Sequence, residues 1–309
     1  MNTKPVIHLG KNSKLLILGL RVFLFVTPLI TIFISCATVS PVNSKRERPA
    51  SFPVIEAVQP HWESFTTGIG YFHGRIARPN LEFWALRIEL ASPDTRIVVR
   101  GGMMDDNRTL STRVSSFVRD NDLIAGVNAV PFDVISATEG RPIRNIGIVI
   151  TDGELIAPAV QRYDALVFYT DGTAAIVSQS VIDSTENIKN AIGGFNRVLE
   201  NGEPARRTLN LEPRHPRSAA GISTNGEYLY LLVIDGRRLG SIGATEKEIA
   251  LLLHALGSWE GLNFDGGGST SLVLRYPDGR AKPVNTPIHK GIPGRERAVA
   301  GCIGIEIGD

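Results

Sequence analysis

Short apolar runs separated by tight-turn residues recur along the chain from about residue 61 to the C-terminus. The runs are rich in β-branched or aromatic residues, and several end at Asp-Gly or Asn-Gly, the dipeptides that favour two-residue β-hairpin turns. This alternation predicts a series of strands connected by hairpins. The predicted strands cover residues 81–90, 96–100, 146–151, 164–169, 173–177, 228–234 and 271–276.

Helical spacing of apolar residues is found in two segments, 244–256 and 111–121. In the first, Thr245 and Glu248 have the spacing of a capping box, and Gly257 is placed to end the helix. Because strands outnumber helices, the pattern predicts an α+β fold. We expect mainly antiparallel sheet with a few packed helices, in a single domain.

The composition allows the chain to bury a hydrophobic core, since 43% of its residues are hydrophobic and 21% are charged. A disordered chain is therefore excluded. Residues 37–60 combine prolines with a cluster of charges, which is typical of a flexible tether. No later segment has the character of a second linker, so the globular domain is predicted to span residues 61–309.

Residues 1–36 have the anatomy of an export signal, with a positively charged start followed by an apolar stretch from 15 to 34. The last four residues, Phe-Ile-Ser-Cys, resemble a bacterial lipobox, in which the cysteine becomes lipid-modified and N-terminal. We therefore expect a lipoprotein signal peptide with Cys36 as its lipidation site. The alternative is an uncleaved membrane anchor formed by residues 15–35. Both interpretations place the domain outside the cytoplasm, attached to a membrane of the bacterial cell envelope.

The charge distribution argues against a nucleic-acid partner. The chain has 33 Lys and Arg against 31 Asp and Glu, which gives a formal charge of +2. Four of the basic residues precede Cys36, where no acidic residue occurs, so the domain itself is slightly acidic and offers no basic field for DNA or RNA. The two cysteines, Cys36 and Cys302, exclude a disulfide framework and a cysteine-based zinc site. No metal or cofactor is predicted.

The densest candidate chemistry lies in the segment 261–271, GLNFDGGGSTS. Three successive glycines lose conformational entropy on folding, so some close approach of the backbone must require them. Consecutive backbone N–H groups beside Asp265 predict a concave site for an anion. The segment is neither a P-loop nor a dinucleotide-binding motif. The alternative interpretation is a flexible turn between two strands.

Two further segments carry candidate anion-binding residues. His215 and Arg217 lie between prolines in the segment 212–221, and a guanidinium group suits phosphate oxygens well. The predicted strand 228–234 leads into Asp235, with Arg237 just beyond. A solvated surface turn explains the first segment equally well, and a hairpin turn explains the second.

Together these segments resemble the phosphodiester glycosidase family. The matching motifs are RHPRSA at 214–219, DGR at 235–237, SIGAT at 241–245 and LNFDGGGST at 262–270. Weaker similarity extends the resemblance over residues 123–307. It implies hydrolysis of a sugar-1-phosphodiester or another phosphate-linked glycan, with release of the sugar and without a cofactor.

The resemblance and the chemistry of the residues imply three groups of site residues. A carboxylate near the anomeric carbon acts as a nucleophile or as a base for water. The candidates for it are Asp265 and Asp235, whose individual roles stay open. The residues expected to bind phosphate are Arg217, Arg237, His215, Gly266, Gly267, Gly268 and Ser269. The residues expected to position sugar hydroxyls are Asn263 and Asn128.

Two other functions use the same residues. A non-catalytic envelope lipoprotein would bind a glycan or sugar-phosphate polymer in the same pocket. A metal-assisted phosphodiesterase would use Asp235, Asp265 and His215 as ligands and would cleave the P–O bond instead of the C–O bond. The sequence lacks a spaced His and Asp ligand motif, so the second alternative ranks last.

Overall fold

A computed structural model of the 309-residue chain describes residues 53–100, 108–206 and 213–308. The predicted signal segment, Cys36 and most of the predicted tether lie outside the described residues. The chain divides into two compact units, 1–49 and 50–309, and the described residues all belong to the second. Within the described ranges, no helix is long and apolar enough to cross a membrane.

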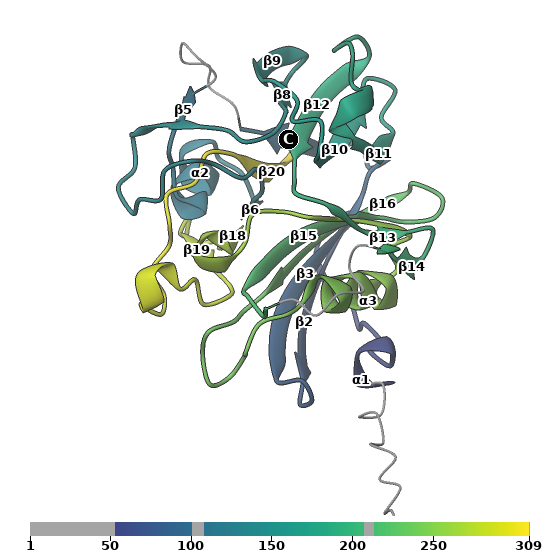
Figure 1. Cartoon of the computed structure of the whole chain (residues 1–309), viewed down its shortest axis with the longest axis vertical. Coiled ribbons are helices and arrows are strands. Elements are labelled where there is room, and N and C mark those ends of the chain that lie inside the picture. Colours follow the sequence, from purple (N-terminus) through teal and green to yellow (C-terminus); the bar gives the residue numbers. More distant parts are fainter. Residues whose placement is uncertain (1–52, 101–107, 207–212, 309) are drawn as a thin grey trace, which may run out of the picture. The chain divides into compact units, whose positions relative to one another are not determined.

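The largest sheet has eight strands, and every pair of neighbours in it is antiparallel. Its middle joins residues that lie far apart in the sequence, because three strands from the C-terminal half follow directly on an N-terminal hairpin (Figure 1). In spatial order the strands are β1 (Glu63–Thr66), β2 (Ile69–Ile76), β3 (Leu81–Glu89), β16 (Tyr228–Ile234), β15 (Arg217–Ile222), β17 (Glu260–Asn263), β13 (Arg197–Glu200) and β14 (Glu203–Pro204).

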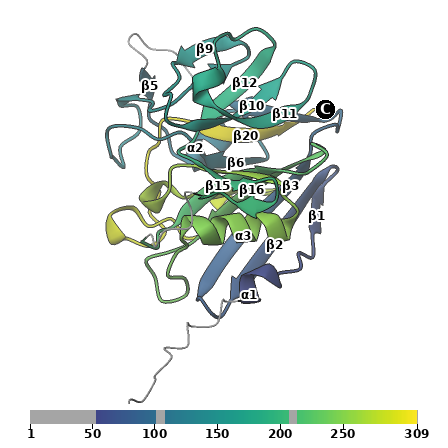
Figure 2. The same cartoon turned by 45° about the vertical axis from the view of Figure 1, so that its right-hand side comes forward.

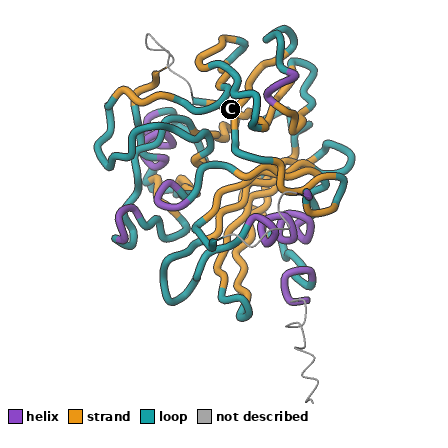
Figure 3. The backbone as a smooth tube through the Cα atoms, viewed as in Figure 1, coloured by secondary structure: helices purple, strands orange, loops and turns teal. Residues whose placement is uncertain are grey.

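Two five-stranded antiparallel sheets and a short pair complete the β structure of the part of the chain that the structure describes (Figure 3). The first sheet consists of β11 (Ala174–Ser178), β10 (Asp164–Tyr169), β12 (Ile188–Gly193), β8 (Val149–Thr151) and β9 (Glu154–Ala157). The second consists of β19 (Ala281–Pro283), β18 (Leu272–Arg275), β6 (Ala125–Asn128), β20 (Cys302–Ile307) and β4 (Thr95–Val99). The pair is β5 (Arg108–Leu110) with β7 (Pro142–Arg144).

The main hydrophobic core joins all three large sheets. Leu86 of β3 and Leu231 of β16 contribute to it from the eight-stranded sheet, and Leu166, Val127 and Ile303 contribute from β10, β6 and β20. All five side chains are fully buried. Successive side chains of a strand point to opposite faces of the sheet. Leu231 therefore belongs to the main core, and the next residue, Leu232, belongs to a second core on the other face.

The other face of the eight-stranded sheet is covered by the helix α3 (Glu246–Leu256), which lies across it in Figure 2. Ile249 and Leu253 of the helix pack with Phe83 and Leu232 of the sheet. The predicted capping box is confirmed, because the Thr245 side chain accepts from the Glu248 N–H group and the Glu248 side chain accepts from the Thr245 N–H group.

The remaining helical segments of the described residues are short. They are α1 (Pro53–Glu56), α2 (Val114–Asp120), and the 3₁₀ turns η2 (Gln179–Val181), η4 (Gly267–Ser269) and η5 (His289–Gly291). Each predicted strand and helix segment overlaps an observed element of the same type. The prediction of mainly antiparallel sheet with few helices is confirmed, whereas the single-domain organisation stays a prediction. Cys302 is fully buried on β20, where burial raises the pKa of its thiol to about 12.

Candidate active site

Three adjacent strands bring the candidate segments to one end of the eight-stranded sheet. In the order β16, β15, β17, Arg217 pairs with Ile234 and Ala219 pairs with Asn263. Antiparallel neighbours run in opposite directions, so the start of β15 lies beside the ends of β16 and β17. The residues just past these ends therefore meet, although they are far apart in the sequence.

A cavity of about 300 Å³ opens at this end of the sheet. It contains one carboxylate together with three guanidinium groups and one imidazole. The residues that line it are Ile135, Phe195, His215, Pro216, Arg217, Arg237, Phe264, Asp265, Gly266, Gly267, Gly268 and Arg297. The structure thus brings together one predicted carboxylate, both predicted arginines, His215 and the three glycines.

Asp265 follows β17 and is held in place through its backbone. Its N–H group donates to the Ala129 carbonyl over 2.8 Å, and its own carbonyl accepts from Asn128 Nδ2 over 2.6 Å. Burial raises the pKa of Asp265 to about 6, although hydrogen bonds from Ser269 and the Gly266 N–H group and the charge of Arg297 oppose this rise. The group is therefore mostly ionised at pH 7, with a pKa suited to a base or nucleophile.

Each of the three glycines has its own structural reason. A Cβ on Gly266 would lie 2.6 Å from the Pro216 carbonyl oxygen, and a Cβ on Gly268 would lie 2.5 Å from Arg297 Nη2. Gly267 has a φ of 63°, in the left-handed region that favours glycine. The sequence predicts that some group lies close to the glycine backbone. In the structure the groups that do so at Gly266 and Gly268 belong to the protein itself, namely Pro216 and Arg297.

The predicted anion-binding role is contradicted at Gly267 and Ser269, because their N–H groups already donate to backbone carbonyls. The Gly266 N–H group donates to the Asp265 carboxylate, and the Gly267 N–H group donates to the Pro216 carbonyl over 2.8 Å. The Ser269 N–H group donates to the Gly266 carbonyl over 3.2 Å. The arginines that line the cavity are therefore the main candidates to bind an anion there.

Two of those cations were predicted, and hydrogen bonds orient them, Arg217 through a backbone carbonyl and Arg237 through the His215 ring. Arg217 donates through Nε to the Ala244 carbonyl over 2.9 Å. Arg237 follows β16 in the left-handed region, with a φ of 59°, and its Nη2 lies 3.3 Å from His215 Nδ1. A non-glycine residue in this conformation is strained and persists only where its surroundings hold it.

The third cation, Arg297, was not predicted as a site residue. Its Nη1 donates to Ser269 Oγ over 3.0 Å, and its Nε donates to His289 Nδ1 over 3.2 Å. His289 is fully buried, and burial together with the positive charges of neighbouring basic residues lowers its pKa. A neutral His289 accepts at Nδ1 and so holds Arg297 toward Asp265. The only sequence signal for Arg297 is its place in the resembled C-terminal segment.

The predicted sugar contacts of Asn128 and Asn263 are contradicted by their burial beneath the cavity. Both side chains are 1% exposed, and neither lines the cavity. Asn128 supports the Asp265 backbone, and its Oδ1 accepts from Ser218 Oγ over 2.7 Å. Asn263 donates to Glu246 Oε1 over 3.2 Å. Ser269, predicted to bind phosphate, is also buried and accepts from Arg297 instead.

Asp235, the second predicted catalytic carboxylate, does not line the cavity either. It is 1% exposed, and its carboxylate accepts hydrogen bonds from Arg238, Asn285 and the Thr286 N–H group. Burial raises its pKa while these donors oppose the rise. The ligand set of the metal-assisted alternative, which needs Asp235 beside Asp265 and His215, is therefore not assembled. Among the described residues, no group of three or more His, Cys, Asp and Glu is placed to hold a metal ion.

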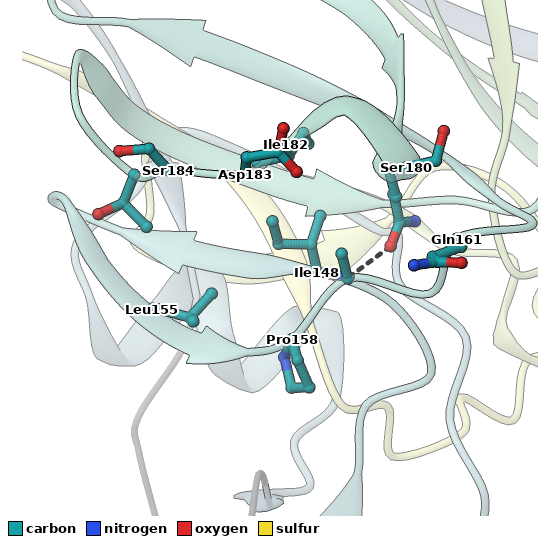
Figure 4. Close-up of a pocket in the computed structure, with 11 residues that line it drawn as sticks. Ile148, Leu155, Pro158, Gln161, Ser180, Ile182, Asp183 and Ser184 are labelled. Carbon is teal, nitrogen blue, oxygen red and sulfur yellow. Dashed lines mark hydrogen bonds between the residues drawn. The ribbon is translucent and has the colours of Figure 1, made fainter.

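A second cavity, of about 360 Å³, lies beside the sheet that contains β8 and β9 (Figure 4). Ile148, Leu155 and Asp183 are among its lining residues, and no Lys, Arg or His lines it. Gln179 also lines it, but its carboxamide bridges backbone groups, accepting from the Ile148 and Val160 N–H groups over 2.9 and 2.8 Å. A lone carboxylate without a cation provides no basis for phosphodiester chemistry, so we assign the site to the first cavity.

Similarity to solved structures supports the fold. The catalytic domain of zebrafish N-acetylglucosamine-1-phosphodiester alpha-N-acetylglucosaminidase, auto-inhibited by its pro-peptide, matches with a TM-score of 0.59 and 19% identity, over 82% of this chain and 87% of that one. A hypothetical protein from Synechocystis matches with a TM-score of 0.56 and 16% identity, over 81% and 64%. A putative exported protein from Burkholderia pseudomallei matches with a TM-score of 0.51 and 15% identity, over 73% and 74%.

Sequence similarity gives the family. The SPbeta prophage-derived uncharacterized protein YomE of Bacillus subtilis is 27% identical over 176 residues, which are 53% of this chain and 26% of that protein. This chain therefore covers about a quarter of the length of that relative. The profile of the phosphodiester glycosidase family matches residues 121–306, more than half of the chain and nearly the segment that its motifs indicated. The chain belongs to the phosphodiester glycosidase family.

Proposed function

We propose that this protein hydrolyses a sugar-1-phosphodiester by cleaving the glycosidic C–O bond, which releases the sugar from its phosphate-linked partner. The observation that carries the proposal is the composition of the cavity. Asp265 is its one carboxylate, and the other charged side chains that line it are the cations of Arg217, Arg237 and Arg297. The zebrafish protein of similar fold is named for N-acetylglucosamine-1-phosphodiester, which supports the substrate class.

The cation-rich cavity suits a phosphate leaving group. Guanidinium groups bind phosphate oxygens through charge-assisted hydrogen bonds, and they stabilise the negative charge that grows as the C–O bond breaks. A phosphate monoester leaves without prior protonation, so the reaction does not need the second, acidic carboxyl group of most glycosidases. A cavity with a single carboxylate is consistent with this requirement.

Asp265 then has one of two roles at the anomeric carbon. As a nucleophile, its carboxylate forms a bond to the carbon while the phosphate leaves with the bonding electrons, and water later releases the sugar. As a base, it takes a proton from the water that attacks the carbon. Both roles require the ionised form. Phe195 and Phe264 also line the cavity and give it apolar walls.

We also propose that the protein acts in the cell envelope, attached by lipid at Cys36. This proposal rests on the export-signal anatomy of residues 1–36, which lie outside the described residues. A membrane-attached enzyme would meet phosphate-linked glycans of the envelope without diffusing away.

The phosphate-binding role of Arg237 and Arg217 can be tested by binding. Replacement of either residue by Ala should weaken binding of N-acetylglucosamine 1-phosphate by about 1.5–3 kcal/mol, the usual contribution of a hydrogen bond to a charged group. Binding of neutral N-acetylglucosamine should change little. Isothermal titration calorimetry of both ligands provides the measurement.

A matched control is Arg275→Ala, which removes a partly exposed arginine that pairs with Asp122 and does not line the cavity. It should leave both affinities unchanged. Equal losses for the phosphorylated and the neutral sugar in the Arg237 variant would contradict a phosphate-binding role and would indicate a general defect of the cavity.

A further inference from the structure

The buried carboxylate of Asp235 has no opening to the cavity, yet its hydrogen-bonding capacity is filled. Oδ2 accepts from Arg238 Nε over 2.8 Å, and Oδ1 accepts from Asn285 Nδ2 over 3.0 Å. The Thr286 N–H group lies 3.1 Å from both oxygens. Burying a carboxylate is costly unless donors of this kind compensate it. The donors from Arg238, Asn285 and Thr286 provide this compensation and hold the Asp235 carboxylate in one orientation.

The donors come from segments that carry the residues lining the cavity. Arg238 directly follows Arg237, which has the strained left-handed conformation. Thr286 begins the segment that leads to His289, the residue that accepts from Arg297. The Asp235 carboxylate is thus hydrogen-bonded to the two segments that position Arg237 and Arg297 in the cavity.

Asn285 extends the connection to the glycine turn. Its Nδ2 also donates to the Thr270 carbonyl over 3.1 Å, and its Oδ1 accepts from the Leu272 N–H group over 2.9 Å. These two backbone groups lie just after Ser269, at the end of the turn that begins with Asp265. A shift of Asn285 would therefore be transmitted to the turn that carries the reacting carboxylate.

The loop after β16 is also fixed to the sheet. Ser241 Oγ donates to the Asp235 carbonyl over 2.6 Å and accepts from the Glu82 N–H group over 3.0 Å. The buried Glu82 carboxylate forms an ion pair with Arg238 as well. A Cβ on Gly240 would lie 2.5 Å from Arg238 Nη1, so glycine at this position leaves room for the guanidinium group. Arg238 is thereby held between two carboxylates, which fixes the backbone of its neighbour Arg237.

We propose that Asp235 is a positioning residue, which sets the placement of Arg237, Arg297 and the Asp265 turn around the substrate phosphate without touching the substrate. The inference rests on the proposed function for the identity of the ligand. It predicts that Asp235 acts through Arg237, so substitutions of the two residues should not have independent effects on phosphate binding.

The test is a double-mutant cycle of Asp235→Asn and Arg237→Ala. Asn has nearly the same shape as Asp, but its NH₂ group would face a donor in either orientation, Asn285 Nδ2 at the Oδ1 position or Arg238 Nε at the Oδ2 position. Titration calorimetry with N-acetylglucosamine 1-phosphate and with inorganic phosphate measures each affinity. We expect Asp235→Asn to weaken binding about tenfold. In that background Arg237→Ala should cost less than about threefold, although it costs more than tenfold in the parent.

Asp278→Asn is the matched control, because Asp278 also pairs with an arginine, Arg280, but lies in the exposed turn between β18 and β19. It should leave the affinities unchanged. Arg238→Lys provides a second route to the same cycle if Asp235→Asn does not fold, since it keeps the charge and loses the Nε donor.

An effect of Arg237→Ala in the Asp235→Asn background as large as its effect in the parent would overturn the proposal. If Asp265 must be ionised, kcat/KM of the parent should fall at low pH. Disappearance of this fall in Asp235→Asn would also overturn the proposal, because the titrating group would then be Asp235 itself. The binding cycle needs no turnover. A parent protein that binds the ligand but does not hydrolyse a phosphodiester would contradict the proposed function and leave the cycle decisive for the positioning role.

Discussion

Replacement of Asp265 by Asn should lower kcat by a factor of roughly 100 or more, because the reaction needs an ionised carboxylate at the anomeric carbon. Asn keeps the size of the side chain and an oxygen that accepts from the Gly266 N–H group. Binding of the sugar phosphate should therefore change much less than kcat. Steady-state kinetics with an N-acetylglucosamine 1-phosphodiester provides the measurement.

The same substitution should not destabilise the protein at neutral pH. Burial raises the pKa of Asp265 to about 6 in the folded state. A carboxyl group with a raised pKa stabilises the fold in its protonated form, and this contribution is lost as the pH rises through about 6. The neutral Asn variant should therefore melt at the same or a higher temperature than the parent at pH 8. A folded variant with near-parental kcat would remove Asp265 from the mechanism, and an unfolded one would show that Asp265 instead caps the glycine turn.

Replacement of Arg297 by Gln should reduce kcat/KM about 100-fold at pH 6 and less at pH 9. The parent should show an acid limb near pH 6, since Asp265 must be ionised in the free enzyme. The positive charge of Arg297 lowers the pKa of Asp265, so its removal should move the limb to higher pH. The remaining loss at pH 9 would reflect the missing phosphate contact.

Arg297→Lys separates the effect of the Arg297 charge on the pKa of Asp265 from the hydrogen bonds that the guanidinium group makes. Lysine keeps the positive charge, so the acid limb should stay near pH 6, but it lacks the fork that reaches both Ser269 and His289. The measurement is the pH profile of kcat/KM for the parent and both variants. An acid limb that stays near pH 6 in Arg297→Gln would show that Arg297 does not influence the ionisation of the reacting carboxylate.

The strand pattern predicted much of the fold because turn dipeptides and apolar runs are local signals. β3, β10, β16 and α3 were found where these signals placed them. β15 was not predicted, since its sequence RSAAGI is short and rich in small residues. Its extended conformation depends on pairing with β16 and β17, which local sequence does not report.

The site was predicted in part for a similar reason. Strand ends indicated the segments around Arg237 and Asp265, and the structure brings both to one cavity. A strand end does not tell which way the next carboxylate turns, and Asp235 turns toward Asn285, fifty residues further along the chain. Arg297 has no local motif, because its approach to Ser269 exists only in the folded chain.

Hydrolysis in ¹⁸O-labelled water tests the central claim, cleavage of the C–O bond, most directly. The labelled atom enters whichever group is attacked, the anomeric carbon or the phosphorus. The released phosphate monoester is the decisive product, because its oxygens do not exchange with water as the anomeric hydroxyl of a free sugar does. Mass spectrometry should find the phosphate unlabelled and the promptly reduced sugar labelled. A labelled phosphate would show attack at phosphorus and would contradict the assignment of the protein as a glycosidase.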